Sequence, residues 1–315
     1  MRVIFTHMTN GTSPQSHSAD SADASPHGTA SSGSRDSNSS RGLRGTGARL
    51  RAGLATSAAH AATWASRKSG RGAGGMIGGL IAQKIDPRIL ASLGKGRPAA
   101  IITGTNGKST TTRMFAAAMR AAGHNVATNE GGDNMDAGII SALLATPDAD
   151  SLVLEVDELH VPHIAEDLKP QVLVLLNLSR DQLDRVGEIN KIEATLRAAV
   201  DANPQATVIA NCDDPLIASA AWDAKKVIWV SAGGGWTNDA TSSPRTGGPI
   251  IQDGHNWYAV KPLPDGSEFK RPEPDYRITA EGVITPAGDT LPMNLTLPGN
   301  ANRGNATLAI AGAVD

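Results

Sequence analysis

The chain has few of the residues on which several classes of protein depend. Cys212 is the only cysteine among 315 residues, so no intrachain disulfide can form and a reducing, cytosolic setting is favoured. Aromatic residues make up only 3% of the chain, which argues against stacking on nucleic-acid bases. The formal net charge is −2, so no overall positive field favours a nucleic-acid partner.

Long apolar runs are also missing. No run reaches the roughly 18 residues of a transmembrane helix, so any membrane contact is expected to be peripheral. The N-terminal residues MRVIFTHMTNG lack an extended apolar core and a cleavage site, which argues against a signal peptide. We therefore predict a cytoplasmic protein, with any membrane contact at the inner face.

The first hundred residues divide into two parts. Residues 1–46 are dominated by Ser, Gly, Ala, Asp and Arg and are predicted to be a disordered tail, because they cannot bury enough apolar surface to offset their conformational entropy. Residues 47–98 are predicted to be a helical lead-in. It would comprise an Ala-rich helix over 48–66 that docks on the body, a Gly-rich link, and a short helix around 86–93.

From residue 99 onward, apolar β-type runs alternate with helical stretches. The runs are AAIIT, SLVLEV, QVLVLLNL, ATVIAN and KVIWVSA, and the helical stretches are 108–122, 137–145, 188–202 and 215–222. Strands that are apolar on both faces and alternate with helices are typical of a mainly parallel sheet covered by helices on both sides. The sequence therefore predicts an α/β domain over residues 99–298.

Two segments depart from that alternation. Residues 233–276 are rich in Gly, Pro and Asp and are predicted to form a small β-rich insertion rather than another βα unit. Residues 299–315 begin a new Ala-rich helix. Since no later segment remains to pack that helix, we predict that it starts an incomplete C-terminal domain.

The strongest candidate site is TGTNGKSTTT, residues 103–112, directly after the first strand. It is shorter than the usual G-x-x-x-x-G-K-[ST] phosphate loop, since Ile102 stands where the first glycine belongs. Glycines in the loop and the free N–H groups of the following helix would bind phosphates, Lys108 would neutralise their charge and Ser109 would ligate Mg²⁺. The predicted phosphate-binding residues are Gly104, Thr105, Asn106, Gly107, Lys108, Ser109 and Thr110.

Acidic and amide side chains follow the next strands. Glu155, inside the apolar run LVLEVDE, is the best second Mg²⁺ ligand, whereas Glu158 fits a solvated strand end. Asn177 and Asp181 follow the strand QVLVLL and are candidates to surround the nucleotide, although a helix cap explains them about equally well. His160 and His163 lack a third ligand, so surface or packing roles are favoured over a metal site.

These motifs together resemble the Mur ligase family, ATP-dependent enzymes of peptidoglycan precursor synthesis. The loop, the glutamate of LEVDE, NLSRDQLDR followed by GEI, NCDDP and LPGNANRGNA occur in the family's order. LEVDE, RDQLDR and SGRGAGGMIGGLIAQKIDPRILASL look like the MurT-type synthetase subunits of lipid II isoglutaminyl synthase. The resemblance runs from about residue 66 to 315.

The resemblance implies a reaction and its participants. The loop would bind ATP, Ser109 and Glu155 would coordinate Mg²⁺, and Asn134 would lie near the γ-phosphate. Asn302 and Asn305 would approach the adenine. A D-glutamate carboxylate of the lipid II stem peptide would be activated as an acyl phosphate and converted by ammonia to D-isoglutamine.

Ammonia would come from a separate glutaminase. Cys212 is the only thiol and has no histidine nearby in the sequence, so a buried structural role is favoured and a GatD-like partner is implied. MurT-type proteins commonly carry a four-cysteine zinc ribbon, but residues 233–276 contain no cysteine, so no cysteine-ligated zinc is expected. The alternatives are an amino-acid-adding Mur ligase, a folylpolyglutamate synthetase-like ligase, or a P-loop nucleotide-binding module without ligase activity.

Overall fold

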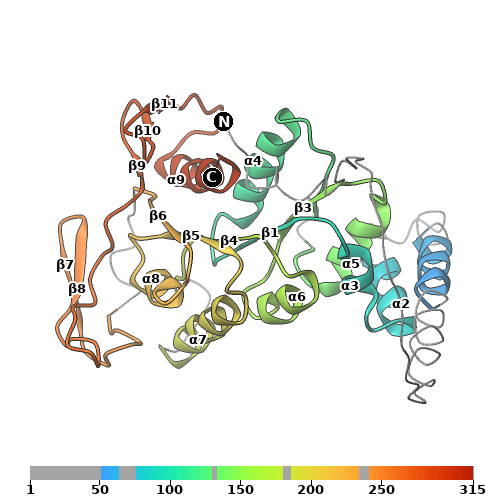
Figure 1. The fold of residues 1–315 in the computed structure, drawn as a ribbon, viewed down its shortest axis with the longest axis horizontal. Coiled ribbons are helices and arrows are strands. Elements are labelled where there is room, and N and C mark those ends of the chain that lie inside the picture. Colours follow the sequence, from blue (N-terminus) through green and yellow to red (C-terminus); the bar gives the residue numbers. More distant parts are fainter. Residues whose placement is uncertain (1–50, 64–75, 130–132, 180–185, 234–240, 315) are drawn as a thin grey trace, which may run out of the picture.

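The computed structural model describes residues 51–63, 76–129, 133–179, 186–233 and 241–314. Its centre is a nine-stranded sheet with the order β11-β10-β9-β6-β5-β4-β1-β3-β2 (Figure 1). Six neighbouring strands, from β6 to the β2 edge, run parallel: β1 (Ala99–Thr103), β2 (Val126–Ala127), β3 (Ser151–Glu155), β4 (Val172–Leu175), β5 (Thr207–Asn211) and β6 (Val227–Ser231). The chain passes from β1 to the β2 edge, returns through β3, and continues on the other side of β1 with β4. β1 is therefore flanked by strands reached in opposite directions, as at the ligand-binding edge of open α/β sheets.

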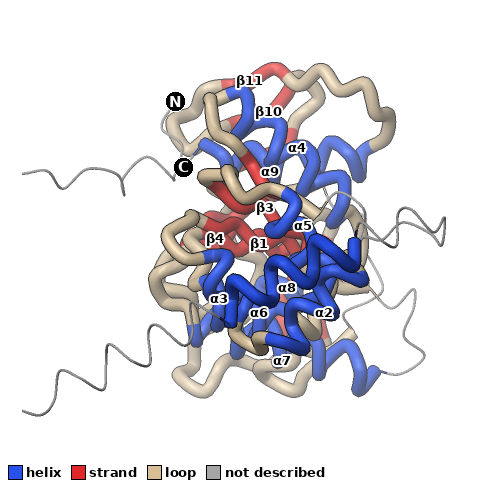
Figure 2. Tube along the Cα trace, turned by 90° about the vertical axis from the view of Figure 1, so that its right-hand side faces the viewer, coloured by secondary structure: helices blue, strands red, loops and turns tan. Residues whose placement is uncertain are grey.

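Helices cover both faces of this sheet (Figures 1 and 2). One face carries α4 (Lys108–Ala121) and α9 (Asn300–Val314), which pack on each other. The other carries α5 (Asp136–Ala145), α6 (Val161–Leu168), α7 (Val186–Ala202) and α8 (Pro215–Ala221). The predicted fold class, a mainly parallel sheet with helices on both faces, is confirmed.

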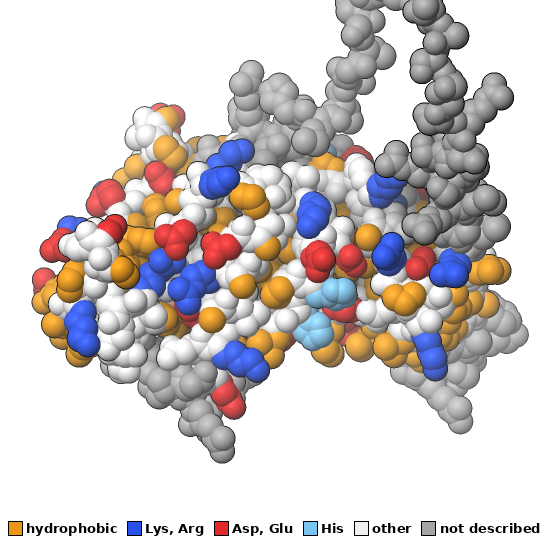
Figure 3. Space-filling model, turned by 60° about the horizontal axis from the view of Figure 1, so that its bottom comes forward, with side chains coloured by type: hydrophobic (Ala, Val, Ile, Leu, Met, Phe, Trp, Pro, Cys, Tyr) orange, Lys and Arg blue, Asp and Glu red, His pale blue; other side chains and the backbone are white. Residues whose placement is uncertain are grey.

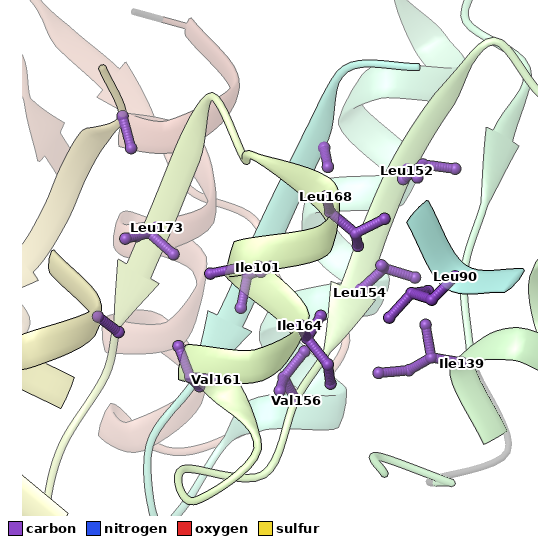
Figure 4. Close-up of a cluster of buried hydrophobic side chains, with 14 of the residues drawn as sticks. Leu90, Ile101, Ile139, Leu152, Leu154, Val156, Val161, Ile164, Leu168 and Leu173 are labelled. Carbon is purple, nitrogen blue, oxygen red and sulfur yellow. The ribbon is translucent and has the colours of Figure 1, made fainter. Parts of the chain in front are cut away.

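Side chains of the central strands point alternately to the two faces of the sheet, and both faces are buried under helices. Ile101 belongs to the core beneath α5, α6 and α7, whereas the next residue, Ile102, belongs to the core beneath α4 and α9. Successive side chains of a strand point to opposite faces, so a strand apolar at every position needs cover on both sides. Figure 4 shows the first core, to which Ile101, Leu152, Leu154 and Ile164 belong.

Three features differ from the sequence-based expectations. α6 was not foreseen, and α2 (Ile77–Ile85) begins inside the segment expected to be a Gly-rich link; α3 (Ile89–Gly94) follows it. The last difference concerns α9, which was expected to have nothing to pack against. It buries residues such as Leu308 and Ala311 in the core shared with α4. Residues 1–46 lie outside the described part of the chain.

The region after β6 adds strands of two kinds. β7 (Ile250–Asp253) and β8 (Asn256–Ala259) form a separate antiparallel hairpin. β9 (Tyr276–Ile278) returns to the main sheet parallel to β6, and β10 (Gly282–Ile284) and β11 (Thr290–Pro292) extend that edge in antiparallel fashion. The limits of the predicted insertion and of the other domains stay predictions.

An aromatic cluster fixes the hairpin to the body. The Phe269 ring lies 4.8 Å from Trp222 and 5.0 Å from Trp257, measured between ring centroids. The indole N–H of Trp257 donates a 2.9 Å hydrogen bond to the backbone oxygen of Cys212. Burial of these rings favours packing of the hairpin on the body, and the Arg271 guanidinium adds two hydrogen bonds to Asp213 at 2.7 and 2.9 Å.

None of the helices in the described ranges is both long and apolar enough to cross a membrane.

Candidate functional site

The TGTNGKSTTT segment forms a tight turn between β1 and α4. Gly104 and Gly107 have φ angles of 134° and 89°, a region that side-chain-bearing residues rarely adopt. A Cβ atom on Gly104 would lie 2.9 Å from the backbone nitrogen and oxygen of Asn177, and one on Gly107 would lie 2.5 Å from Asn305 Oδ1. The two glycines therefore let the loop pass between the end of β4 and the start of α9.

Asn177 holds the loop from the β4 side. Its Oδ1 accepts a 2.9 Å hydrogen bond from the Asn106 backbone N–H, and its Nδ2 donates a 2.8 Å hydrogen bond to the Asn106 backbone oxygen. The backbone oxygen of Asn177 also accepts from Thr105 N–H at 2.8 Å. Both hydrogen bonds of the Asn177 side-chain amide are therefore made to the Asn106 backbone, so this side chain positions the loop.

Lys108 begins α4 and folds back over the loop. Its Nζ donates to the Gly104 oxygen at 2.6 Å and lies 3.5 Å from Glu158 Oε1. Glu158 is only 8% exposed, so the expectation of a solvated strand end was wrong for this residue. The ammonium is held by a carbonyl and a carboxylate at the mouth of the loop, where an incoming phosphate could exchange for these partners.

The first turn of α4 completes a phosphate cradle. Ser109 and Thr110 are half-buried there, and the helix N-terminus brings unpaired N–H groups and the positive end of its dipole. The helix dipole and the Lys108 ammonium fit an anionic ligand that accepts hydrogen bonds.

Glu155 ends β3 directly beside β1, paired in register with Ile102. Its carboxylate accepts a 3.4 Å hydrogen bond from Asn134 Nδ2, which brings these two predicted site residues together. Asn129 fixes the Glu155 backbone, since its Oδ1 accepts from Glu155 N–H at 2.9 Å and its Nδ2 donates to Glu155 O at 2.7 Å. A hydroxyl on Ser109 and a carboxylate on Glu155 are oxygen donors of the kind Mg²⁺ prefers, and Mg²⁺ keeps much of its water shell.

A cavity of about 440 Å³ opens beside the loop. Asn106 and Gly107 form its loop side, and Asn300, Gly304 and Asn305 of α9 form the opposite wall. Its size and mixed lining suit a small organic ligand. Asn305 lines this cavity, whereas Asn302 is not among its lining residues, and the Asn302 Nδ2 donates to the Pro298 oxygen at 2.8 Å. The approach of both side chains to an adenine stays a prediction.

Asn211 is a cavity residue that the sequence reading missed. Its Nδ2 donates to the Leu176 oxygen at 2.9 Å, and its Oδ1 accepts from Asp213 N–H at 3.0 Å. Its place in NCDDP at the end of β5 was the available signal, because parallel strands end at a common edge.

The remaining candidates lie elsewhere. Asp181 is outside the described residues. His160 Nδ1 and His163 Nε2 approach the Asp136 carboxylate at 3.1 and 3.4 Å, yet the described residues contain no group of three His, Cys, Asp or Glu side chains suited to a metal ion. Cys212 is fully buried, and burial together with the neighbouring Asp213 raises the pKa of its thiol. The expected burial of Cys212 is confirmed.

The fold and the loop define the class of protein: an open α/β sheet with a phosphate-loop motif at the carboxyl ends of its strands. The chain belongs to the Mur ligase family, because the model of the Mur ligase middle domain matches residues 102–313. α9 lies within that match, and the resemblance seen in the sequence motifs is confirmed.

Within this family, the chain is similar to proteins of two kinds, MurT-named synthase subunits and D-glutamate ligases. The chain is 32% identical over 223 residues to the Streptococcus pneumoniae protein named lipid II isoglutaminyl synthase (glutamine-hydrolyzing) subunit MurT, a match covering 66% of this chain and 49% of that protein. It is 34% identical over 158 residues to the Staphylococcus aureus protein of the same name, covering 48% and 36%. A UDP-N-acetylmuramoylalanine–D-glutamate ligase from Pelotomaculum thermopropionicum is 35% identical over 123 residues, covering 39% and 26%.

The chain thus spans about half the length of the first of these relatives and less of the others. Among solved structures, the pseudomurein peptide ligase type C from Methanothermus fervidus matches with a TM-score of 0.54 at 21% identity, covering 72% of this chain and 48% of that one. At this identity the match supports the fold alone.

Proposed function

We propose that this chain is the ATP-binding part of an ATP-dependent carbon–nitrogen ligase that amidates the D-glutamate carboxylate of the lipid II stem peptide. The observation that carries the proposal is the phosphate cradle between Asn177 and Asn305, with Lys108 at its mouth, in a chain whose MurT-named relatives match more of it than the D-glutamate ligases do. That difference in coverage also favours amidation over the addition of an amino acid.

The reaction would proceed in two displacements. A carboxylate oxygen of D-glutamate attacks the γ-phosphorus of ATP, and ADP leaves with the electrons of the broken P–O bond. Ammonia then attacks the acyl carbon, inorganic phosphate leaves, and loss of a proton gives the amide. Lys108 would stabilise the charge that spreads over the transferred phosphoryl group, and the loop N–H groups would hold the remaining phosphates.

Four of the predicted site residues would act on the metal, the acceptor and the adenine side. Ser109 and Glu155 would hold Mg²⁺, which supplies charge neutralisation at the phosphates. Asn134, which contacts Glu155, would lie near the γ-phosphate and the acceptor carboxylate. Asn305 and the cavity wall from α9 would receive the adenine side of ATP.

A separate glutaminase would supply ammonia. A glutaminase thiol must ionise to attack glutamine, whereas burial raises the pKa of Cys212 and hides it from solvent. The chain would therefore work beside a GatD-like subunit, at the inner face of the membrane where a lipid-linked substrate lies.

The test combines the full-length protein, a glutaminase partner, lipid II, ATP, Mg²⁺ and glutamine. Mass spectrometry of the stem peptide should show replacement of a carboxyl hydroxyl by an amino group. Ammonium chloride in place of glutamine and glutaminase should restore the product and so isolate the ligase step. Hydrolysis of ATP without amidated peptide in both reactions would contradict the proposal, and addition of an amino acid instead would favour the alternative ligase.

A further inference from the structure

α2 exposes its large apolar side chains and buries its smallest ones. The buried positions are Gly78, Gly79 and Ala82, whereas Ile77 and Leu80 are 40% and 54% exposed. At about 100° per residue, Ile77, Leu80 and Lys84 fall in a stripe about 60° wide, opposite the buried positions. A surface helix of a globular domain usually has the reverse arrangement.

Close packing of the glycines fixes this orientation. A Cβ atom on Gly78 would overlap Thr63 Oγ1 of the helix over residues 51–63, and one on Gly79 would overlap the backbone oxygen of Ala137 in α5. The Gly79 N–H also donates a 2.8 Å hydrogen bond to Ser141 Oγ. Rotating α2 to bury Leu80 would bring bulky side chains into these contacts, so the exposure of the stripe follows from the packing.

Positive charge is concentrated in the same part of the chain. Residues 41–100 contain eleven Lys and Arg against one acidic residue, Asp86, whereas residues 101–315 contain 16 Lys and Arg against 27 Asp and Glu. Asp86 is buried. Of the five described Lys and Arg residues in this range, Arg97 is half-buried and the other four are exposed, namely Arg51, Lys84, Arg88 and Lys95. Figure 3 shows Lys and Arg side chains among hydrophobic ones at its right-hand end, the end where α2 and α3 lie in Figure 1.

We propose that the exposed stripe of α2, with the cations around it, docks on the surface of an anionic lipid bilayer. Ile77, Leu80 and the half-buried Ile81 enter the boundary of the acyl chains, and Lys84 and Arg88 meet the headgroup phosphates. A lipid surface offers both an apolar acyl boundary and anionic headgroups, so it matches the apolar stripe and the cations together. This contact goes beyond the ligase reaction and needs neither nucleotide nor lipid-linked substrate.

The experiment is co-sedimentation of the full chain with vesicles of phosphatidylcholine alone and of equal parts phosphatidylcholine and phosphatidylglycerol. The wild type should bind the anionic vesicles, release them in high salt, and leave the neutral ones unbound. Ile77→Gln/Leu80→Gln should weaken binding at least about tenfold, because two apolar contacts with the acyl boundary are lost. Lys84→Gln should weaken it about fivefold.

A matched control is Ile251→Gln/Val260→Gln on and beside the β7–β8 hairpin, where the exposed fractions are 40% and 56%. This control should bind like the wild type, and unchanged circular dichroism should show that every variant is folded. Equal binding by the two glutamine pairs, or no binding of the wild type to anionic vesicles, would overturn the proposal. So would light scattering that shows a wild-type dimer broken by Ile77→Gln/Leu80→Gln, or displacement of the vesicles by duplex DNA.

Discussion

Removal of the Asn177 amide should weaken nucleotide binding without unfolding the domain. Asn177→Ala deletes both side-chain hydrogen bonds to the Asn106 backbone, at 2.9 and 2.8 Å. A buried hydrogen bond contributes about 1 kcal/mol net, so the loop loses about 2 kcal/mol of support. If the free energy of ATP binding has to order the loop in place of these hydrogen bonds, the affinity for ATP should fall about 30-fold.

Calorimetry with ATP·Mg²⁺ and with adenosine separates the loop from the cavity. For Asn177→Ala, ATP binding should weaken while adenosine binding stays nearly unchanged, because only the phosphates use the loop. Asn211→Ala is a matched control, since Asn211 also makes two hydrogen bonds and lines the same cavity but contacts no loop residue through them. Wild-type ATP affinity in Asn177→Ala, or an equal loss in both variants, would refute the positioning role.

Three further predictions concern other parts of the structure. Gly107→Ala should lower ATP affinity about tenfold in the same calorimetric assay, because alanine at a φ of 89° costs about 1–2 kcal/mol and its Cβ would meet Asn305; unaltered affinity would show that the turn is free to relax. Cys212 should resist iodoacetamide at pH 8 in the native protein and react in guanidinium, because burial raises the pKa of its thiol and shields it; stoichiometric labelling of the native protein would contradict this. Burial raises the pKa of Glu193, so its carboxylate costs stability as the pH rises above the ordinary carboxyl value of 4.5. Glu193→Gln should therefore gain in thermal midpoint relative to wild type as the pH rises, and parallel midpoint curves would refute that cause.

Much of the fold was predictable because each central strand is a short apolar run that can be recognised in the sequence without its neighbours. Five apolar runs gave β1, β3, β4, β5 and β6 to within a few residues, since a strand buried on both faces is apolar at successive positions. The start of α2 was not predicted, because two adjacent glycines such as Gly78 and Gly79 usually indicate a linker rather than a helix. Here, their missing side chains permit contact with Thr63 and Ala137, a tertiary effect that overrides helix propensity.

The site was predictable as a motif but not as a set of contacts. TGTNGKSTTT could be recognised as a phosphate loop from the sequence alone, since its glycine, lysine and serine stand at fixed spacings between a strand and a helix. The pairing of Lys108 with Glu158, and the fixing of Glu155 by Asn129, join segments 50 and 26 residues apart. Such pairs depend on how the strand ends meet, which no local pattern encodes.

Calorimetric binding of ATP·Mg²⁺ to the wild type and to Lys108→Met tests most directly whether the loop holds the phosphates. If it does, the wild type binds ATP·Mg²⁺ more tightly than adenosine, and Lys108→Met lowers ATP affinity toward that of adenosine while adenosine binding is retained. Equal ATP affinity in the two proteins, or wild-type binding that does not distinguish ATP from adenosine, would contradict the claim that this loop holds the phosphates.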